Sequence, residues 1–194
     1  MAFTSPQNNI DQFDLSKGMY VADLGAGSGA YAIAAARKVG EEGKVKAVEV
    51  QKELLGRIRD LAVSEHLFNV EAIWGDIEKS GGTRLKDESM DAVIISNVLF
   101  QSVEKGNLVR ESFRILKPNR KVLFVEWSGS HGGLGPMLEE VVLPDIAKKL
   151  FTDNGFEYEK DIYASDNHYG IIFRKKTTSS GTKVEVESEE VKSD

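Results

Sequence analysis

Apolar residues occur along the chain in short, nearly continuous runs that alternate with longer segments of helical period. The runs are rich in Val, Ile, Leu and Phe, a composition typical of strands buried on both faces of a parallel sheet. They occupy residues 19–24, 44–50, 69–74, 90–96 and 121–127. The helical segments occupy residues 29–39, 52–66 and 103–117. This alternation predicts an α/β fold with right-handed crossovers and with helices on both faces of a parallel sheet.

The pattern changes after the fifth of these strands. Residues 129–136 are rich in glycine, and a helix is expected over residues 139–152. Two further strands are expected over residues 156–163 and 168–174. Only four residues, 164–167, separate these two strands, a link that permits a hairpin and is too short for a parallel crossover. The sheet is therefore expected to be mixed, with an antiparallel element at its C-terminal end.

Both ends of the chain are polar. Residues 1–18 carry a few apolar positions and are expected to form a short amphipathic lead-in helix before the first strand. Residues 176–194 are rich in Ser, Thr and Glu and have no apolar periodicity, which predicts a disordered tail. One domain is expected to span residues 1–175, because 194 residues is the length of a single domain rather than two.

Composition excludes several classes of function. The chain has no cysteine, which excludes disulfides, thiolate metal sites and cysteine nucleophiles. It carries 31 acidic against 25 basic residues and no block of five or six basic ones, so we expect no extended surface for nucleic acid. No apolar run reaches eighteen residues, and the N-terminus has neither a basic nor an apolar region. We therefore expect a cytoplasmic protein with no membrane span.

A glycine-rich turn follows the first predicted strand, in the string VADLGAGSGA at residues 21–30. Gly25, Gly27 and Gly29 fall where the strand must turn sharply into a helix, and glycine there lets a ligand lie against the backbone. Glu49 stands at the end of the second strand, 20 residues after Gly29. An acidic side chain at that place can bind the hydroxyls of a ribose. Together these features predict a ligand that contains adenosine.

The glycine string also matches the G-x-G-x-x-A form of the dinucleotide fingerprint, so the turn alone does not choose the ligand. Asp23 precedes Gly25 by two residues, where its charge would repel a pyrophosphate and stabilise an α-ammonium group. Asp76, after the third strand, can accept a hydrogen bond from an adenine amine. This acidic rim favours a cationic adenosine that carries an amino acid over a dianionic dinucleotide.

With these features the chain resembles the class I, Rossmann-like S-adenosylmethionine-dependent methyltransferases over residues 10–175. The motifs that carry the resemblance are DLGAGSG, VEV, GDIE, DAVIISNVLFQ, RILKPNRKVLFVEW and the last hairpin. The chain is most similar to the small-molecule branch that contains the quinone-biosynthesis C-methyltransferases. The resemblance implies a single Rossmann-like doubly wound domain with a seven-stranded, mostly parallel sheet and an antiparallel C-terminal strand. It also implies S-adenosylmethionine as cofactor and in-line methyl transfer to a small organic acceptor.

The resemblance further implies roles for individual residues. The methionine end of the cofactor would lie at Asp23 and the glycine turn, with Asn97 at its amino group. Glu49 would bind the ribose, and Val50 would lie against an adenine face. Asp76 would accept from the adenine amine. The implied cofactor-binding residues are Asp23, Gly25, Ala26, Gly27, Gly29, Glu49, Val50, Asp76, Ile77 and Asn97.

The acceptor side is predicted from topology, because ligands of open α/β sheets bind outside the carboxyl ends of the parallel strands. Phe100 and Gln101 follow the fourth strand and Trp127 ends the fifth, so these three are expected in the substrate pocket. His131 and His168 map to the same edge and are candidate catalytic residues, or else hydrogen-bonded loop residues. No set of residues has metal-ligand spacing, so no metal is expected.

Other interpretations stay open at this stage. Only 24 residues precede Gly25, which leaves the acceptor site open, or completed by residues 129–136 or by a partner chain in a homo-oligomer. The acceptor could be RNA or protein, although residues 97–100 lack the Asn-Pro-Pro-aromatic string of amino-methylating nucleic-acid enzymes. A non-catalytic module that binds S-adenosylmethionine is a further alternative. An NAD-dependent oxidoreductase of short-chain type is disfavoured, because no late Tyr-x-x-x-Lys pair is present.

Overall fold

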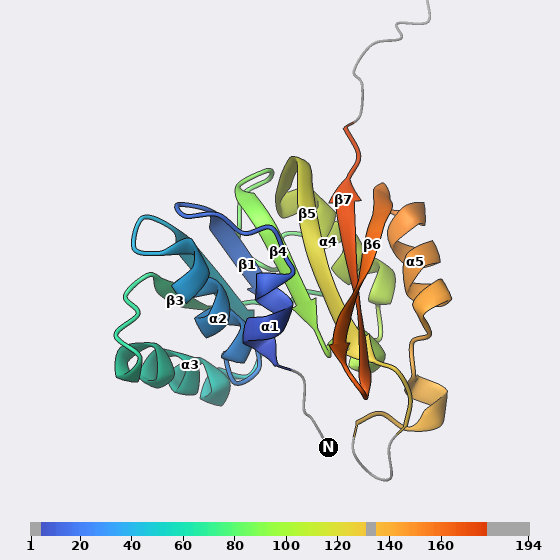
Figure 1. Ribbon diagram of the computed structural model, residues 1–194, viewed down its shortest axis with the longest axis horizontal. Coiled ribbons are helices and arrows are strands. Elements are labelled where there is room, and N and C mark those ends of the chain that lie inside the picture. Colours follow the sequence, from blue (N-terminus) through green and yellow to red (C-terminus); the bar gives the residue numbers. More distant parts are fainter. Residues whose placement is uncertain (1–4, 131–134, 178–194) are drawn as a thin grey trace, which may run out of the picture.

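The computed structural model describes residues 5–130 and 135–177, which form a seven-stranded sheet covered by helices (Figure 1). Its elements are α1 (Pro6–Asp11), β1 (Tyr20–Leu24), α2 (Ala30–Val39), β2 (Lys44–Glu49), α3 (Lys52–Ser64), β3 (Val70–Trp74), β4 (Met90–Ser96), η1 (Leu99–Gln101), α4 (Lys105–Ile115), β5 (Leu116–Trp127), η2 (Leu138–Glu140), α5 (Pro144–Asp153), β6 (Phe156–Ser165) and β7 (His168–Lys175). The α1 helix is the expected lead-in helix, and the tail from residue 178 onward lies outside the described residues.

The strand order is β3-β2-β1-β4-β5-β7-β6. Strands β1 to β5 pair in parallel, whereas β7 pairs antiparallel with both β5 and β6. The α/β fold, its mostly parallel seven-stranded sheet and the antiparallel C-terminal strand are thus confirmed. Among the parallel strands β1 to β5, one connection has no helix, because residues 75–89 join β3 to β4 directly.

Two elements begin five residues from where they were predicted, and the other predicted helix and strand ends after residue 18 agree within two residues. Strand β5 begins at Leu116 rather than residue 121, because Leu116 pairs with Met90 across an irregularity in the register. Residues 117–121 of this strand are polar or proline, so the hydrophobic pattern alone could not reveal where the strand begins. Helix α5 begins at Pro144 rather than residue 139, since proline suits the first helical position and lacks the N–H needed further in. The preceding segment forms the short turn η2 instead.

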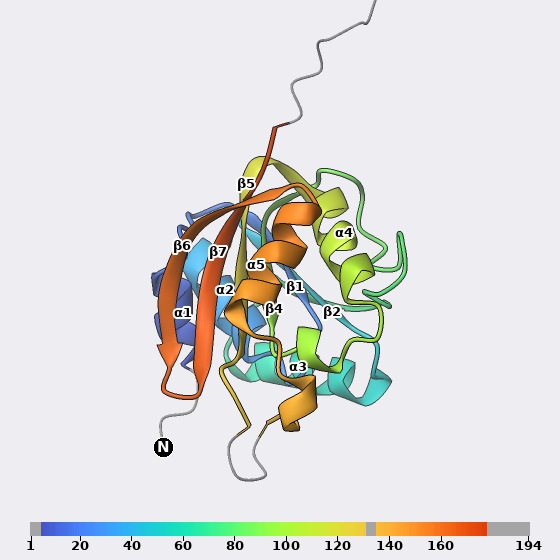
Figure 2. The same cartoon turned by 90° about the vertical axis from the view of Figure 1, so that its right-hand side faces the viewer.

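Side chains alternate along the central strands and fill two separate apolar layers. One layer packs β1, β4 and β5 against α4 and α5, and the other packs the opposite face against α1, α2 and α3. Figure 2 shows α1 and α4 on opposite sides of the sheet. Phe151 of α5 stacks on Phe173 of β7 with ring centroids 4.2 Å apart, which anchors α5 on the antiparallel end.

The parallel strands β1, β2, β4 and β5 all end at one edge of the sheet, where the connecting turns lie. The edge is therefore built from segments distant in sequence but held by one rigid sheet. None of the described helices has the length and apolar character needed to cross a membrane.

Candidate functional site

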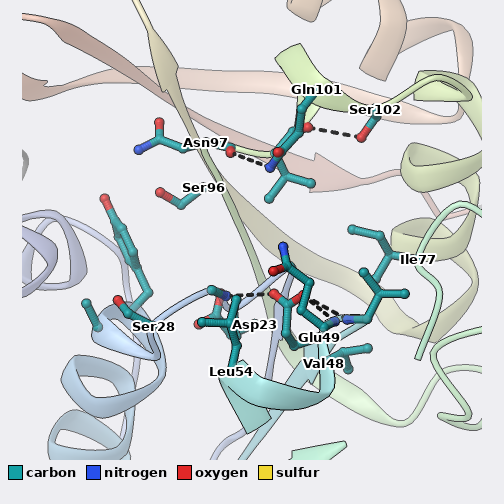
Figure 3. Close-up of a pocket in the computed structure, with 18 of the residues that line it drawn as sticks. Asp23, Ser28, Val48, Glu49, Leu54, Ile77, Ser96, Asn97, Gln101 and Ser102 are labelled. Atoms are coloured by element: carbon teal, nitrogen blue, oxygen red, sulfur yellow. Dashed lines mark hydrogen bonds between the residues drawn. The ribbon is translucent and has the colours of Figure 1, made fainter. Parts of the chain in front are cut away.

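A cavity of about 740 Å³ opens at the carboxyl edge of the parallel strands. Figure 3 shows Asp23 and Glu49 on one side of this space and Asn97 and Gln101 on the other. Twelve of the residues predicted from the sequence line it: Asp23, Gly25, Ala26, Gly27, Glu49, Val50, Asp76, Ile77, Asn97, Gln101, Trp127 and His168. The structure therefore brings both acidic strand ends, Glu49 and Asp76, into one cavity with the glycine turn.

Three predicted residues are not placed in this cavity. Gly29 is the residue before α2, and a Cβ there would meet the side chain of Ile58 at 3.1 Å, so its glycine serves packing between α2 and α3. Phe100 packs its ring against the apolar core and only its neighbours reach the cavity. His131 lies outside the described residues.

The glycine turn is tied to the neighbouring strand by its backbone. The N–H groups of Gly25 and Ala26 both donate to the carbonyl of Val48, at 2.9 and 3.1 Å. A Cβ on Gly25 would lie 2.6 Å from Val98, whereas one on Gly27 would meet nothing closer than a backbone oxygen at 4.0 Å. Gly25 thus permits close packing, and Gly27 leaves open space at the cavity surface.

Glu49 is buried, with 6% of its surface exposed, and its carboxylate accepts three backbone hydrogen bonds. One oxygen accepts from Gly27 at 2.9 Å, and the other accepts from Val50 at 2.8 Å and Gln51 at 2.9 Å (Figure 3). A carboxylate has about four acceptor positions, so about one remains for a ligand. The side chain is therefore oriented by the protein itself.

Asp23 is the most deeply buried acid of the cavity, with 2% of its surface exposed. Burial raises the pKa of its carboxyl to about 7; the N–H of Ala32 opposes this shift and the charge of Glu49 adds to it. Its Oδ2 receives no hydrogen bond from any described residue. A buried carboxylate oxygen without a donor is costly, and a cationic ligand would stabilise it.

Asn97 follows β4 in a left-handed conformation, with φ of 54°. Its N–H donates to the carbonyl of Val125 at 2.9 Å, and its carbonyl accepts from the side chain of Gln101 at 3.2 Å. Within residues 5–130 and 135–177, no group donates to its buried Oδ1. Asn97 thus carries a second acceptor oxygen that has no donor among the described residues, and it lines the same cavity as Asp23.

The third acid, Asp76, is paired within its own turn. Its carboxylate accepts from the N–H of Glu78 at 3.1 Å and forms an ion pair of 2.9 Å with Lys79. The hydrogen bond from Lys79 is the main cause that lowers the pKa of Asp76, so this carboxylate stays ionised. Trp74, the last residue of β3, donates its indole N–H to the carbonyl of Val50 at 2.9 Å and so fixes the segment after Glu49.

On the far side of the cavity, Trp127 and His168 stand side by side with ring centroids 4.1 Å apart. Their strands pair these two positions directly, and Nδ1 of His168 lies 3.0 Å from the hydroxyl of Ser165. Tyr31 also lines the cavity, and its hydroxyl accepts from the side chain of Asn9 at 2.7 Å. No sequence pattern indicated Tyr31, Ser165 or Asn9, because only the tertiary fold places them at this edge.

No cluster of three or more His, Asp or Glu side chains suited to a metal ion occurs in the described part of the chain. The residues that line the cavity carry carboxylates, amides, hydroxyls and ring nitrogens besides their backbone groups. These suit an organic ligand with a cationic amine and several hydroxyl or amine donors.

Comparison with known proteins agrees with this chemistry. A family model described as a methyltransferase domain matches residues 15–183. The chain is 32% identical over 108 residues to arsenite methyltransferase of Halobacterium salinarum, an alignment that covers 56% of this chain and 27% of that protein. It is 32% identical over 123 residues to the ubiquinone/menaquinone biosynthesis C-methyltransferase of Salmonella arizonae, covering 61% and 47% of the two chains.

Among solved structures, the chain is similar to a SAM-dependent methyltransferase from Aquifex aeolicus, with a TM-score of 0.80 and 25% identity. That match covers 88% of this chain and 89% of the other. The chain spans less than half the length of the two curated relatives named above. The family model, however, matches well over half of this chain, which therefore belongs to the class I S-adenosylmethionine-dependent methyltransferases.

Proposed function

We propose that this chain transfers a methyl group from S-adenosylmethionine to a small organic acceptor. The observation that carries the proposal is a pair of buried acceptor oxygens, Oδ2 of Asp23 and Oδ1 of Asn97, which have no donor among the described residues and belong to two residues that line one cavity. An α-ammonium group would donate to both. The cofactor of the family carries that group on its methionine end, so the residues present fit it.

The remaining cavity residues fit the adenosine end. The free acceptor position of Glu49 would take a ribose hydroxyl, and Asp76 would accept from the adenine amine. Val50 and Ile77 both line the cavity and offer apolar contacts to the adenine ring. Gly27 leaves the surface of the turn open to the methionine segment. Gly29 does not line the cavity, so its part would be to hold the turn rather than to touch the cofactor.

When bound, the cofactor supplies an electrophilic methyl group on a sulfonium, and the protein mainly supplies alignment and exclusion of water. Alignment alone contributes on the order of 7 to 11 kcal/mol to such a displacement. Asp23 and Glu49 are oriented by burial and by backbone hydrogen bonds before a ligand enters. Less reorganisation is then needed when the acceptor attacks.

The acceptor would lie against Gln101, Trp127 and His168, which line the side of the cavity away from the glycine turn. Phe100 is left out of this set because its ring packs into the core. His168 carries an imidazole on this side and would accept a proton from an acceptor that carries one. The two curated relatives are named for arsenite and for ubiquinone and menaquinone biosynthesis, which supports a small molecule rather than RNA or protein.

Calorimetric titration tests the cofactor assignment. S-adenosylmethionine and its demethylated product, S-adenosylhomocysteine, are expected to bind with micromolar or tighter affinity, and NAD is expected not to compete. Tight NAD binding without binding of either sulfur compound would overturn the assignment. Transfer of a labelled methyl group to a small molecule from a cell extract would then separate an enzyme from a non-catalytic binding module. Label that appears only in RNA or protein would overturn the acceptor class.

A further inference from the structure

Glu126 is a fully buried carboxylate that does not line the cavity and has no part in the proposed function. It is the next-to-last residue of β5, and because side chains alternate along a strand it lies on the face opposite to Trp127. One carboxylate oxygen accepts from the N–H of Phe100 at 3.2 Å, and the other accepts from the N–H of Trp127 at 2.9 Å.

The bond from Phe100 joins two walls of the cavity, and the bond from Trp127, the next residue in the chain, orients the carboxylate. Phe100 belongs to η1, and the segment around it contributes Asn97, Val98, Gln101 and Ser102 to the cavity lining. Trp127 contributes the far wall. The carboxylate of Glu126 therefore ties the turn after β4 to the end of β5 from behind the cavity.

The turn held in this way is strained. Asn97 has a positive φ, a conformation that costs a residue other than glycine free energy and persists where the surroundings hold it in place. The N–H of Asn97 donates to Val125, one residue before Glu126. Asn97 is thus fixed to β5 by a backbone bond, and the η1 turn that follows is fixed by the Glu126 side chain.

We propose that Glu126 is a positioning residue: its buried carboxylate holds η1 against β5 and thereby sets the position of Asn97 in the cofactor cavity. The consequence for cofactor binding rests on the proposed function, whereas the mechanical link does not. The hold depends on charge, because hydrogen bonds to an ionised carboxylate are about twice as strong as those to a neutral group.

The surroundings of Glu126 bring the pKa of its carboxyl close to neutral pH. Burial raises its pKa to about 7, and the N–H groups of Trp127, Phe100 and Leu99 oppose that shift. Lys105, at the start of α4, also favours the ionised form. Tyr169 faces Glu126 from β7, where burial and the nearby carboxylate raise the tyrosine pKa and keep it neutral. Protonation below about pH 7 should therefore loosen the hold on η1.

Nuclear magnetic resonance of the ¹⁵N-labelled protein tests the link directly. The backbone amide protons of Phe100 and Trp127 should titrate together with an apparent pKa near 7 and move to lower frequency on acidification, as their acceptor loses charge. The Glu126→Gln variant should abolish both titrations. If neither amide titrates between about pH 5 and 9 in the unaltered protein, or if both still titrate in Glu126→Gln, the proposal is wrong.

Glu111→Gln is the matched control. Glu111 is also buried and also accepts backbone N–H groups, from Gly81 and Thr83, but it stands on α4 away from the cavity. Both variants are expected to lower the melting temperature, since each leaves a buried N–H without its acceptor. Only Glu126→Gln should remove the Phe100 titration, and this variant should weaken binding of S-adenosylhomocysteine by about tenfold at pH 8.

The amide titrations test the mechanical link, and the affinity for S-adenosylhomocysteine tests the proposed function. An unaltered protein that binds no S-adenosylhomocysteine while its Phe100 and Trp127 amides titrate as described would overturn the proposed function and leave the mechanical link intact. Titrating amides with an affinity equal in Glu126→Gln and the unaltered protein would show that the link does not position the site, which would overturn the inference.

Discussion

The backbone N–H of Gly27 donates to the carboxylate of Glu49 at 2.9 Å, a bond between the tip of the glycine turn and the end of the neighbouring strand. The same carboxylate accepts from the first two residues of the segment that follows β2. Glu49 therefore organises both sides of the cavity edge before any ligand is present. A site held in this way loses less freedom on binding, which favours affinity.

Replacing Glu49 tests its part in cofactor binding. Glu49→Ala removes the remaining acceptor position and leaves the Gly27 N–H unpaired, so the affinity for S-adenosylhomocysteine should fall by about 1.5–3 kcal/mol, the scale of a hydrogen bond to a charged group. Calorimetry measures the change. Glu71→Ala is the control, because Glu71 is an exposed carboxylate on the adjacent strand that pairs only with Lys46 among the described residues. An equal affinity in both variants would remove Glu49 from the site.

Substitutions at two glycines with positive φ can distinguish an effect on cofactor affinity from an effect on stability. A Cβ on Gly27 or on Gly18 would meet no atom closer than 4.0 Å, and both have a left-handed backbone. Alanine at either position should cost about 1–2 kcal/mol of stability, because it adopts that backbone poorly. Only Gly27 lines the cavity, so only Gly27→Ala should also weaken cofactor binding, by about tenfold. Thermal melting and calorimetry together check this, and an unchanged affinity in Gly27→Ala would contradict it.

Much of the sheet edge could be predicted from the sequence because local signals and topology coincide there. Glycines after a buried strand indicate a sharp turn, and acidic residues at the ends of parallel strands must share an edge. That reasoning led to Asp23, Glu49 and Asp76, which do meet in one cavity. It could not indicate that the Glu49 carboxylate accepts hydrogen bonds from three backbone N–H groups, since these donors are brought to it only when the turn folds.

The acceptor side was predicted less well, for a physical reason. Phe100 and Gln101 are adjacent in the same short turn, and whether a side chain points into the core or the cavity depends on the backbone of η1. In the sequence, Glu126 is one more acidic residue near the end of a predicted strand. Its burial and its hold on the Phe100 N–H arise from packing between β5, β7 and η1, which no local pattern encodes.

The raised pKa of Asp23 predicts opposite pH effects on folding and on cofactor binding. The folded protein holds a proton on Asp23 up to about pH 7, whereas the unfolded chain releases it near 3.8. Between these values the folded state binds more protons, so the Asp23 contribution to stability falls as pH rises through this window. An ammonium group needs the ionised carboxylate, so affinity should rise over the upper part of the same window.

Asp23→Asn isolates this contribution, because the amide is neutral at every pH. The variant should melt at a higher temperature than the unaltered protein at pH 8, where the unaltered protein carries a buried charge, and the difference should shrink toward pH 5. Its affinity for S-adenosylhomocysteine should be lower at pH 8 and nearly independent of pH. Thermal melting and calorimetry across this range measure both. A variant that is less stable than the unaltered protein at pH 8 would show that Asp23 is not destabilised by its charge.

His168 gives the last prediction, which concerns proton transfer rather than binding. If the acceptor loses a proton during methylation, His168→Gln should reduce the rate of label transfer by about 100- to 10,000-fold, the usual range for a lost general base. Cofactor affinity should change less than about twofold, since His168 lies across the cavity from the glycine turn. His66→Gln is the control, because His66 follows α3 at the opposite edge of the sheet and is exposed. Equal rates in the two variants would leave His168 as part of the cavity wall, packed against Trp127 and hydrogen-bonded to Ser165, with no role in moving a proton.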